Sequence, residues 1–342
     1  MIEGHGDDLY LYANVRMNFS SNICQHADHS ALKQHLACRL DPIANYPEPE
    51  AWSLERLIAE RHGVDPRSVI VTNGATEAIY LVAQAFAMHH RCIEPTFSEY
   101  ADAIRVYRSG KKSGRALWLC NPNNPTGEAL EPDRVLQLAR ENSLLVVDQS
   151  YEHYTAVPML TPRQAVGAGN IVQLHSFTKT YAVPGLRIGY IVAAPRLTRQ
   201  LRRYLRPWSV GVLAVEAGRF LVEHAQPVSV DLAEAQRLRH LLQSTGAVTV
   251  RETHTNFMLC HVEALTAARL KDYLVREHGM LIRDASNFRG LTPHHFRVAA
   301  QTPPENEALF SALRQYLSST PSLVGFGSAE AIPSESNPPS HA

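Results

Sequence analysis

Ser176-Phe177-Thr178-Lys179-Thr180-Tyr181-Ala182-Val183-Pro184-Gly185-Leu186-Arg187 is the stretch on which the interpretation of this sequence depends. The apolar run at residues 171–174 predicts a buried strand before it, and Pro184-Gly185 predicts a turn near its end. A lysine at the edge of an apolar site and near another positive charge has a lowered pKa, which makes its amine nucleophilic. Lys179 is therefore a candidate nucleophile with Arg187 as the second charge, although a surface lysine at a strand end is the simpler alternative for this stretch alone.

Strands and helices alternate on both sides of this stretch. Strand-like runs lie at residues 68–72, 115–120, 144–147 and 187–193, and the residues between them include helical patterns. Short apolar runs separated by helices are typical of a mostly parallel sheet that is covered on both faces. We therefore predict an α/β fold, with a large domain over residues 46–210.

Polar residues follow several of these strands. Residues 74–76 form a small-residue turn before a helix, where free backbone amides can bind a phosphate. Asn124 lies in an irregular Asn-Pro loop, and Asp148 ends a buried strand with Tyr151 three residues later. Because ligands gather at the carboxyl ends of strands in α/β sheets, these residues predict a binding site. Taken singly, the turn suits any strand-to-helix connection, and Asp148 suits a helix cap.

The second half of the chain has a different pattern. Residues 195–244 are mostly helical, and strands and helices follow. We predict a linking helix and a smaller α+β domain over residues 211–318. Residues 319–342 are rich in serine and proline and have too little apolar surface to fold, so we expect a disordered tail. Residues 1–45 contain no long periodic segment and predict an arm that packs on the small domain and the active site.

The charges of the chain are balanced, with 33 basic and 33 acidic residues. This balance gives no net attraction to nucleic acid or to an anionic membrane, so neither partner is expected. The five cysteines form no CxxC pair, which favours a reducing compartment and argues against a metal site. No leader pattern is present, and no apolar run approaches the roughly 20 residues of a membrane span, so we expect a cytoplasmic protein.

Together the motifs resemble the fold-type I enzymes that use pyridoxal 5'-phosphate (PLP), the aspartate aminotransferase superfamily. The resemblance implies that Lys179 carries the cofactor, that Asp148 pairs with its pyridine nitrogen and that Phe97 stacks on its ring. Tyr151 and Asn124 would bind the phenolate oxygen of the cofactor. Its phosphate would be held by two turns and by a tyrosine from a second subunit of a homodimer, through Gly74, Ala75, Thr76, Ser176, Arg187 and the neighbouring chain's Tyr46.

Within this superfamily the chain is similar to two classes of enzyme, the L-threonine-O-3-phosphate decarboxylases and the histidinol-phosphate aminotransferases. The segments at residues 5–6, 18–23, 95–100 and 283–291 look more like the decarboxylases, which make (R)-1-amino-2-propanol phosphate for cobalamin biosynthesis. That resemblance implies that Arg297 binds the carboxylate of the substrate. Arg283 and the arm near His5 would bind its phosphate, and Asn22 would also contact the substrate. The alternative is an aminotransferase that passes the amino group to 2-oxoglutarate.

Two further features bear on this resemblance. The segment between Tyr100 and Arg115 is short, as though a strand and part of a helix of the large domain were missing. Some chains of this fold serve as sensor domains in transcription regulators, but no helix-turn-helix segment or basic extension precedes the fold in this sequence. We therefore predict a PLP-dependent enzyme that needs no metal ion.

Overall fold

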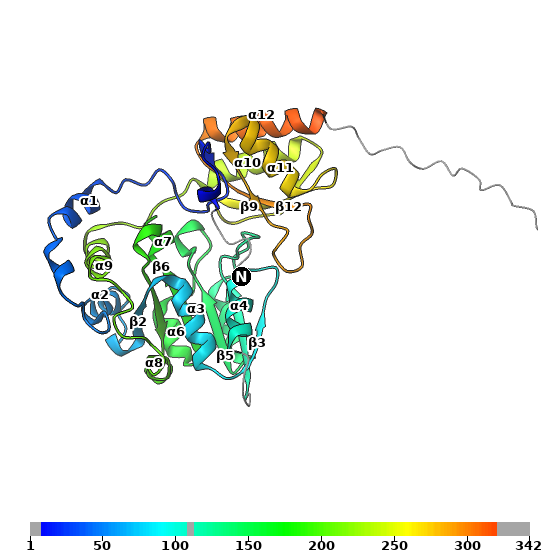
Figure 1. The fold of residues 1–342 in the computed structure, drawn as a ribbon. Coiled ribbons are helices and arrows are strands. Elements are labelled where there is room, and N and C mark those ends of the chain that lie inside the picture. The colour runs from blue at the N-terminus through cyan, green and yellow to red at the C-terminus, as the bar shows by residue number, and fades with distance from the viewer. Residues whose placement is uncertain (1–7, 108–112, 320–342) are drawn as a thin grey trace, which may run out of the picture.

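The computed structural model describes residues 8–107 and 113–319, which form two domains (Figure 1). The larger domain contains a six-stranded sheet with the order β2-β7-β6-β5-β4-β3. Neighbouring strands from β3 to β6 run parallel, whereas β7 is antiparallel to both β6 and β2. The predicted mostly parallel α/β sheet is therefore confirmed. Its strands are β2 Val69–Thr72, β3 His89–Cys92, β4 Arg115–Cys120, β5 Leu144–Asp148, β6 Ile171–Ser176 and β7 Gly189–Ala193.

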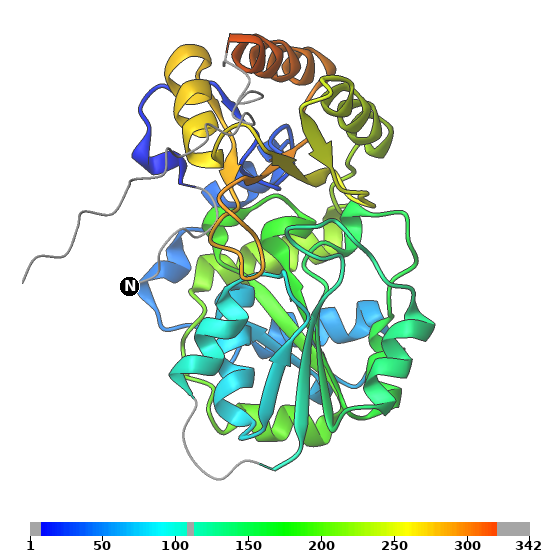
Figure 2. The ribbon, with the colours of Figure 1, turned by 90° about the vertical axis from the view of Figure 1, so that its right-hand side faces the viewer.

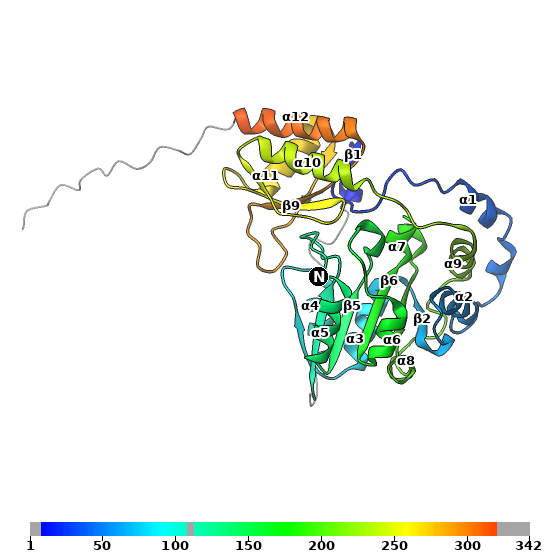
Figure 3. The ribbon, with the colours of Figure 1, turned by 180° about the vertical axis from the view of Figure 1, so that it is seen from behind.

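Alternate side chains of the central strands enter two cores on opposite faces of this sheet. In β5, Leu144 and Val146 join one core, and Leu145 and Val147 join the other, because successive residues of a strand point to opposite faces. Figures 1 and 3 show the helices that cover the two faces. The first core includes α3 Gly74–Ala85, α4 Glu99–Val106 and α8 Pro195–Arg202, and the second includes α5 Pro132–Arg140 and α6 Pro162–Ala168. Burial on both faces explains why the central strands β5 and β7 are mostly apolar in the sequence.

The smaller domain is an antiparallel sheet packed against helices, which agrees with the predicted α+β domain. Its strand order is β11-β12-β9-β8, and α10, α11 and α12 share one apolar core with the sheet. Figure 2 shows the connection between β11 and β12 reaching toward the large domain. The elements are β8 Val248–Val250, β9 Phe257–Val262, β11 Arg283–Asp284, β12 His295–Ala299, α10 Leu232–Ser244, α11 Ala267–His278 and α12 Pro303–Ser319.

The N-terminal arm contacts both domains (Figure 1). Strand β1 Met17–Asn18 pairs in parallel with β10 Met280–Leu281, and Phe19 enters the core of the small domain. Further along, helix α1 Ser30–Ala37 packs against helix α9 Val212–His224. Helix α1 was not predicted, because this short helix buries only Leu32 and so lacks a periodic apolar pattern.

The domain boundary predicted at residue 210 lies between helices α8 and α9. Helix α9 Val212–His224 follows that boundary, yet it packs on α2 Trp52–His62 and shares a core with the large-domain strands β2 and β7. The apolar period of α9 predicts a helix but does not indicate which domain the helix covers. We therefore propose a boundary at residues 225–231, between α9 and α10.

Some predicted features fall outside the described residues. These are His5, the tail from residue 320 onward and part of the short segment before Arg115. On either side of that segment, β3 and β4 are direct neighbours in the sheet. In the described parts of the chain, no helix has the length and apolar character needed to cross a membrane. The remaining short helices are η1 Leu9–Leu11, η2 Asp41–Ala44, η3 Pro66–Ser68, η4 Glu152–Tyr154, α7 Phe177–Thr180 and η5 Pro184–Leu186.

Candidate active site

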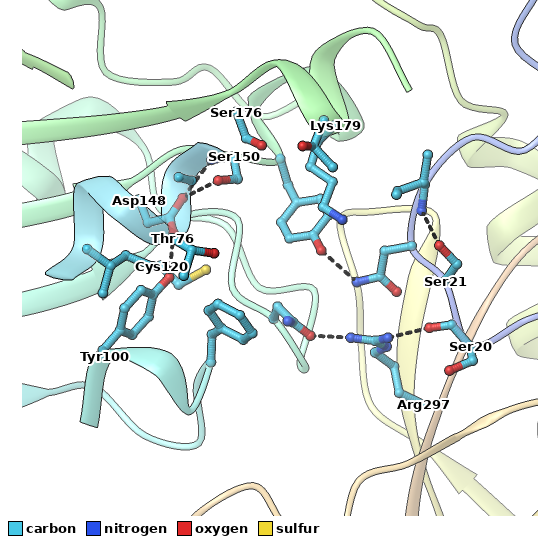
Figure 4. Close-up of a pocket in the computed structure, with 18 of the residues that line it drawn as sticks. Ser20, Ser21, Thr76, Tyr100, Cys120, Asp148, Ser150, Ser176, Lys179 and Arg297 are labelled. Atoms are coloured by element: carbon cyan, nitrogen blue, oxygen red, sulfur yellow. Dashed lines mark hydrogen bonds between the residues drawn. The ribbon is translucent and has the colours of Figure 1, made fainter. Parts of the chain in front are cut away.

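A pocket lies where the carboxyl ends of β4, β5 and β6 meet the arm and the small domain (Figure 4). Its volume of about 200 Å³ is several times the roughly 30 Å³ that one water occupies in the liquid, so it can hold a small ligand. Most of the predicted site residues line it, although they come from distant parts of the chain: Asn22, Ala75, Thr76, Phe97, Asn124, Asp148, Tyr151, Ser176, Lys179, Arg187 and Arg297.

The first turn of α3 forms an anion cradle at one side of this pocket. Its N-cap residue Asn73 makes no side-chain capping bond, so the amides of the turn and the helix dipole can act on an anion. Gly74 has a φ of +74°, and a Cβ there would lie 2.7 Å from Nη2 of Arg187. Arg187 itself has a φ of +54° after the turn η5, which brings its guanidinium to Gly74. The sequence predicted that this strand begins at Arg187. In the structure, strand β7 begins at Gly189.

Asp148 ends β5 and is buried. Its Oδ1 accepts hydrogen bonds from the backbone amide of Ser150 at 2.9 Å and from the hydroxyl of Ser150 at 2.6 Å. Its Oδ2 accepts a hydrogen bond from the hydroxyl of Tyr100 at 2.7 Å. Burial and the charge of Asp148 raise the pKa of Tyr100 well above its usual range, so this hydroxyl stays protonated and donates. Asp148 thus forms a local turn with Ser150. It does not cap a helix, which was the alternative role that the sequence allowed.

Lys179 lies in the short helix α7, directly after β6. The hydroxyl of Tyr154 donates a hydrogen bond to the carbonyl of Lys179 at 3.0 Å, which holds this turn in place. The lysine Nζ lies 5.6 Å from the centre of the Tyr151 ring. Asn22 donates through Nδ2 to the hydroxyl of Tyr151 at 3.2 Å, and burial raises the pKa of Tyr151 to about 12. Tyr151 therefore keeps its proton and can donate it to a ligand while it accepts from Asn22.

Arg297 closes the pocket from the small domain. It lies on β12 and is only 4% exposed. Its Nη1 donates to Oδ1 of Asn124 at 2.5 Å, and its Nη2 donates to the carbonyl of Ser20 at 2.5 Å. The two acceptors belong to the large domain and to the arm, and Arg297 itself belongs to the small domain. The plane of the guanidinium is therefore fixed by three separate segments of the chain.

Arg283 is the cross-strand partner of Arg297. The two residues are opposite each other in the antiparallel pair β11–β12, so their side chains lie on the same face of the sheet. Arg283 is buried, and its Nη2 donates to Oδ1 of Asn287 at 2.9 Å. Burial lowers the pKa of Arg283, and the nearby charge of Asp8 opposes this effect. Arg283 is thus beside the arm, and it is not among the residues that line the pocket.

Tyr46 lies apart from the pocket, at the surface of the large domain. It is 88% exposed, and the centre of its ring is 5.8 Å from that of Trp208. Sequence analysis also missed several residues that line the pocket, among them Ser20, Cys120, Ser150, Thr178 and Tyr100. Ser150 could have been found, because a serine two residues after an aspartate commonly closes a local turn with it.

A family model described as aminotransferase class I and II matches residues 14–116 and 107–313. The chain belongs to this family. The class I and II aminotransferase family is PLP-dependent and has the fold-type I architecture, so this chain is a PLP-dependent enzyme, as its sequence motifs predicted.

Family members of two kinds match most of the chain. Threonine-phosphate decarboxylase of Salmonella typhimurium is 31% identical over 347 residues, covering 88% of this chain and 91% of that protein. Histidinol-phosphate aminotransferase 1 of Carboxydothermus hydrogenoformans is 29% identical over 304 residues, covering 80% of this chain and 84% of that protein. The crystal structure of L-threonine-O-3-phosphate decarboxylase from Porphyromonas gingivalis has a TM-score of 0.83 at 36% identity, covering 88% of this chain and 99% of that one.

The residues of the pocket suit the cofactor of this family. An anion cradle, a buried carboxylate and a lysine face one cavity. In addition, Oδ1 of Asn22 and Oγ of Ser20 are buried and have no hydrogen-bond partner among the described residues. Because buried polar atoms are normally satisfied, these two atoms favour a polar ligand beside them.

Proposed function

We propose that this protein is a PLP-dependent decarboxylase that converts L-threonine O-3-phosphate to (R)-1-amino-2-propanol phosphate, as in cobalamin biosynthesis. The observation that carries the proposal is the cross-strand pair of buried arginines, Arg283 and Arg297. Two guanidinium groups on one face of the small-domain sheet suit a substrate with two anionic groups. Histidinol phosphate has a phosphate but no carboxylate. The similarity to the two threonine-phosphate decarboxylases supports the same class of substrate.

The large domain would hold the cofactor. Its phosphate would lie in the cradle at the start of α3, with the hydroxyl and guanidinium groups that face the cradle adding hydrogen bonds, through Gly74, Ala75, Thr76, Ser176 and Arg187. Asp148 would face the pyridine nitrogen, and Phe97 would stack on the ring. Tyr151 and Asn124 would donate to the phenolate oxygen. PLP supplies an electron sink for the bonds at the substrate α-carbon.

Lys179 and Arg297 would have separate roles in the reaction. The Nζ of Lys179 would hold the cofactor and, near Tyr151, move a proton at the substrate carbon. Arg297 would bind the substrate carboxylate through its planar fork, whose orientation is fixed by Asn124 and Ser20. A fixed carboxylate determines which bond of the α-carbon is aligned for cleavage, and thereby the class of reaction. Arg283, with the arm near His5, would bind the phosphate, and Asn22 would also contact the substrate.

A homodimer is part of the proposal. Tyr46 and Trp208 expose aromatic surface on the large domain, and Ile43 is 63% exposed nearby in the chain. Exposed apolar side chains that gather in one place mark an interaction surface. In the dimer, Tyr46 would reach the phosphate cradle of the second copy. The location in the cytoplasm stays a prediction.

The proposal is tested by product analysis. The purified protein, loaded with PLP, is incubated with phosphothreonine, phosphoserine or histidinol phosphate, each with and without 2-oxoglutarate. We expect carbon dioxide and aminopropanol phosphate from phosphothreonine without any amino acceptor. Conversion of histidinol phosphate that requires 2-oxoglutarate, with no carbon dioxide from phosphothreonine, would mean that the enzyme is an aminotransferase.

A further inference from the structure

Tyr100 connects two residues that would contact the cofactor. Its hydroxyl donates to Oδ2 of Asp148 at 2.7 Å, and its side chain is 1% exposed. Its ring packs edge-on against Phe97, with centroids 5.7 Å apart at 84°, and stacks on Trp118 from 5.5 Å. Figure 4 shows the hydroxyl of Tyr100 pointing at the carboxylate from the side opposite Ser150. One side chain thus contacts both the carboxylate and the aromatic residue of the pocket.

The hydrogen bonds of Asp148 indicate a specific role for Tyr100. A carboxylate has about four lone-pair positions. On Oδ1, two are taken by the amide and hydroxyl of Ser150, within a turn that the local sequence forms by itself. On Oδ2, one is taken by Tyr100, which comes from a different strand-to-helix connection. The remaining position on Oδ2 is the one that a ligand can use, and its direction depends on the bond from Tyr100.

The direction of this bond is fixed as well. Burial keeps Tyr100 protonated, since its pKa is raised well above the usual range. A carboxylate and a neutral tyrosine can form only the bond in which the tyrosine donates.

We infer that Tyr100 is a positioning residue that fixes Oδ2 of Asp148 and thereby holds the proton on the pyridine nitrogen of the cofactor. This inference rests on the proposed placement of that nitrogen opposite Asp148. Without the donor, Oδ2 gains electron density and rotational freedom, so the shared proton moves toward the carboxylate and the ring loses part of its capacity as an electron sink.

The test compares two substitutions of the same kind, Tyr100→Phe and Tyr80→Phe. Tyr80 also donates to a carboxylate, Oε2 of Glu99 at 3.1 Å, but it does not line the pocket. Nitrogen NMR of PLP labelled at the pyridine nitrogen reports the protonation of that atom. We expect its resonance to move toward the unprotonated value in Tyr100→Phe and to stay unchanged in Tyr80→Phe. We also expect kcat to fall about tenfold to a hundredfold, as for the loss of a hydrogen bond to a charged group, with KM nearly unchanged.

Thermal unfolding separates this role from a structural one. If Tyr100→Phe only lowers the melting temperature and leaves both the nitrogen resonance and kcat at the values of Tyr80→Phe, the inference is wrong. The variant Asp148→Asn tests the premise separately. If Asp148→Asn leaves the resonance unchanged, the cofactor lies in another orientation and the proposed site itself fails. If Asp148→Asn moves the resonance and Tyr100→Phe does not, only the role of Tyr100 is removed.

Discussion

The wall of the pocket that the large domain forms and the wall that the arm and small domain form are built in different ways. We call them the cofactor wall (Ala75, Thr76, Asp148, Ser176, Lys179 and Arg187) and the substrate wall (Ser20 to Ile23 and Arg297). In the cofactor wall, Asp148 and Ser176 end adjacent strands of one sheet. In the substrate wall, Arg297 is held by the carbonyl of Ser20, 277 residues away in the chain, and by Asn124.

This difference separates two tasks. Residues at the ends of buried strands are fixed by the core of a single domain, so the cofactor wall can form without the small domain. The substrate wall exists only when β1 pairs with β10 and the arm lies across the pocket. We therefore expect substitutions in the cofactor wall to lower the turnover of every substrate, and substitutions in the substrate wall to change which substrate reacts and how.

The largest effect is expected for Lys179→Ala. Removal of the amine should abolish covalent attachment of the cofactor and leave no measurable turnover. Borohydride reduction followed by mass spectrometry measures the attachment, and Lys33→Ala, at an exposed lysine of α1, is the control. A reducible adduct of undiminished yield in Lys179→Ala would mean that another lysine anchors PLP.

The next effect is expected for Asp148→Asn. A neutral amide cannot stabilise the positive charge on the pyridine nitrogen, so kcat should fall by about a hundredfold or more. Circular dichroism should show an unchanged fold, because the residues have nearly the same shape. A variant that turns over phosphothreonine at nearly the wild-type rate would place Asp148 outside the electronic part of the cofactor wall.

Arg297→Lys should separate the two walls. Lysine keeps the charge but loses the planar fork, so kcat/KM for phosphothreonine should fall by about a hundredfold. The affinity for PLP, measured by titration of the apoenzyme, should stay unchanged. Arg251→Lys is the control, at a half-exposed arginine paired with Glu128. If both variants behave alike, Arg297 is not the carboxylate ligand.

Arg283→Ala should act on binding more than on turnover. Loss of a charge-assisted contact should raise KM for phosphothreonine about tenfold to a hundredfold, with little change in kcat. Unphosphorylated threonine is the internal control, since its KM should not depend on Arg283. An equal rise in KM for both substrates would contradict a phosphate role.

The smallest effect is expected for Tyr46→Phe, which removes one hydroxyl at the proposed dimer interface. The dissociation constant of PLP should rise about tenfold. In a mixed dimer of one Tyr46→Phe subunit and one Lys179→Ala subunit, both substitutions affect the same active site. The other active site should therefore be intact. A fully active monomer in sedimentation would rule this arrangement out.

Much of the cofactor wall could be predicted from the sequence, because local rules govern it. An apolar run ending in Asp148, and another before Lys179, each imply a position at the edge of the sheet. The small residues at Gly74 indicate a strand-to-helix turn, and its role as a phosphate site was predicted only together with the other motifs. The predicted strand at Arg187 was two residues too long, because a positive φ at a non-glycine residue depends on tertiary contacts and leaves no local pattern.

The substrate wall could be predicted only from family resemblance. Nothing in the local sequence of Ser20 indicates that its carbonyl accepts from Arg297. In the sequence, Tyr100 cannot be distinguished from an ordinary aromatic core residue. Its hydrogen bond to Asp148 depends on how α4 packs against the sheet. The packing of α9 on α2 could not be predicted for the same reason, since periodicity predicts a buried face but not the partner of that face.

The central claim, that the substrate wall makes this PLP enzyme a decarboxylase, is tested most directly by stoichiometry. Phosphothreonine labelled in its carboxyl carbon is given to the wild-type enzyme without an amino acceptor, and labelled carbon dioxide is counted against the substrate consumed. We predict one carbon dioxide for each phosphothreonine, with aminopropanol phosphate in equal amount. Consumption that requires 2-oxoglutarate and releases no label would contradict the account.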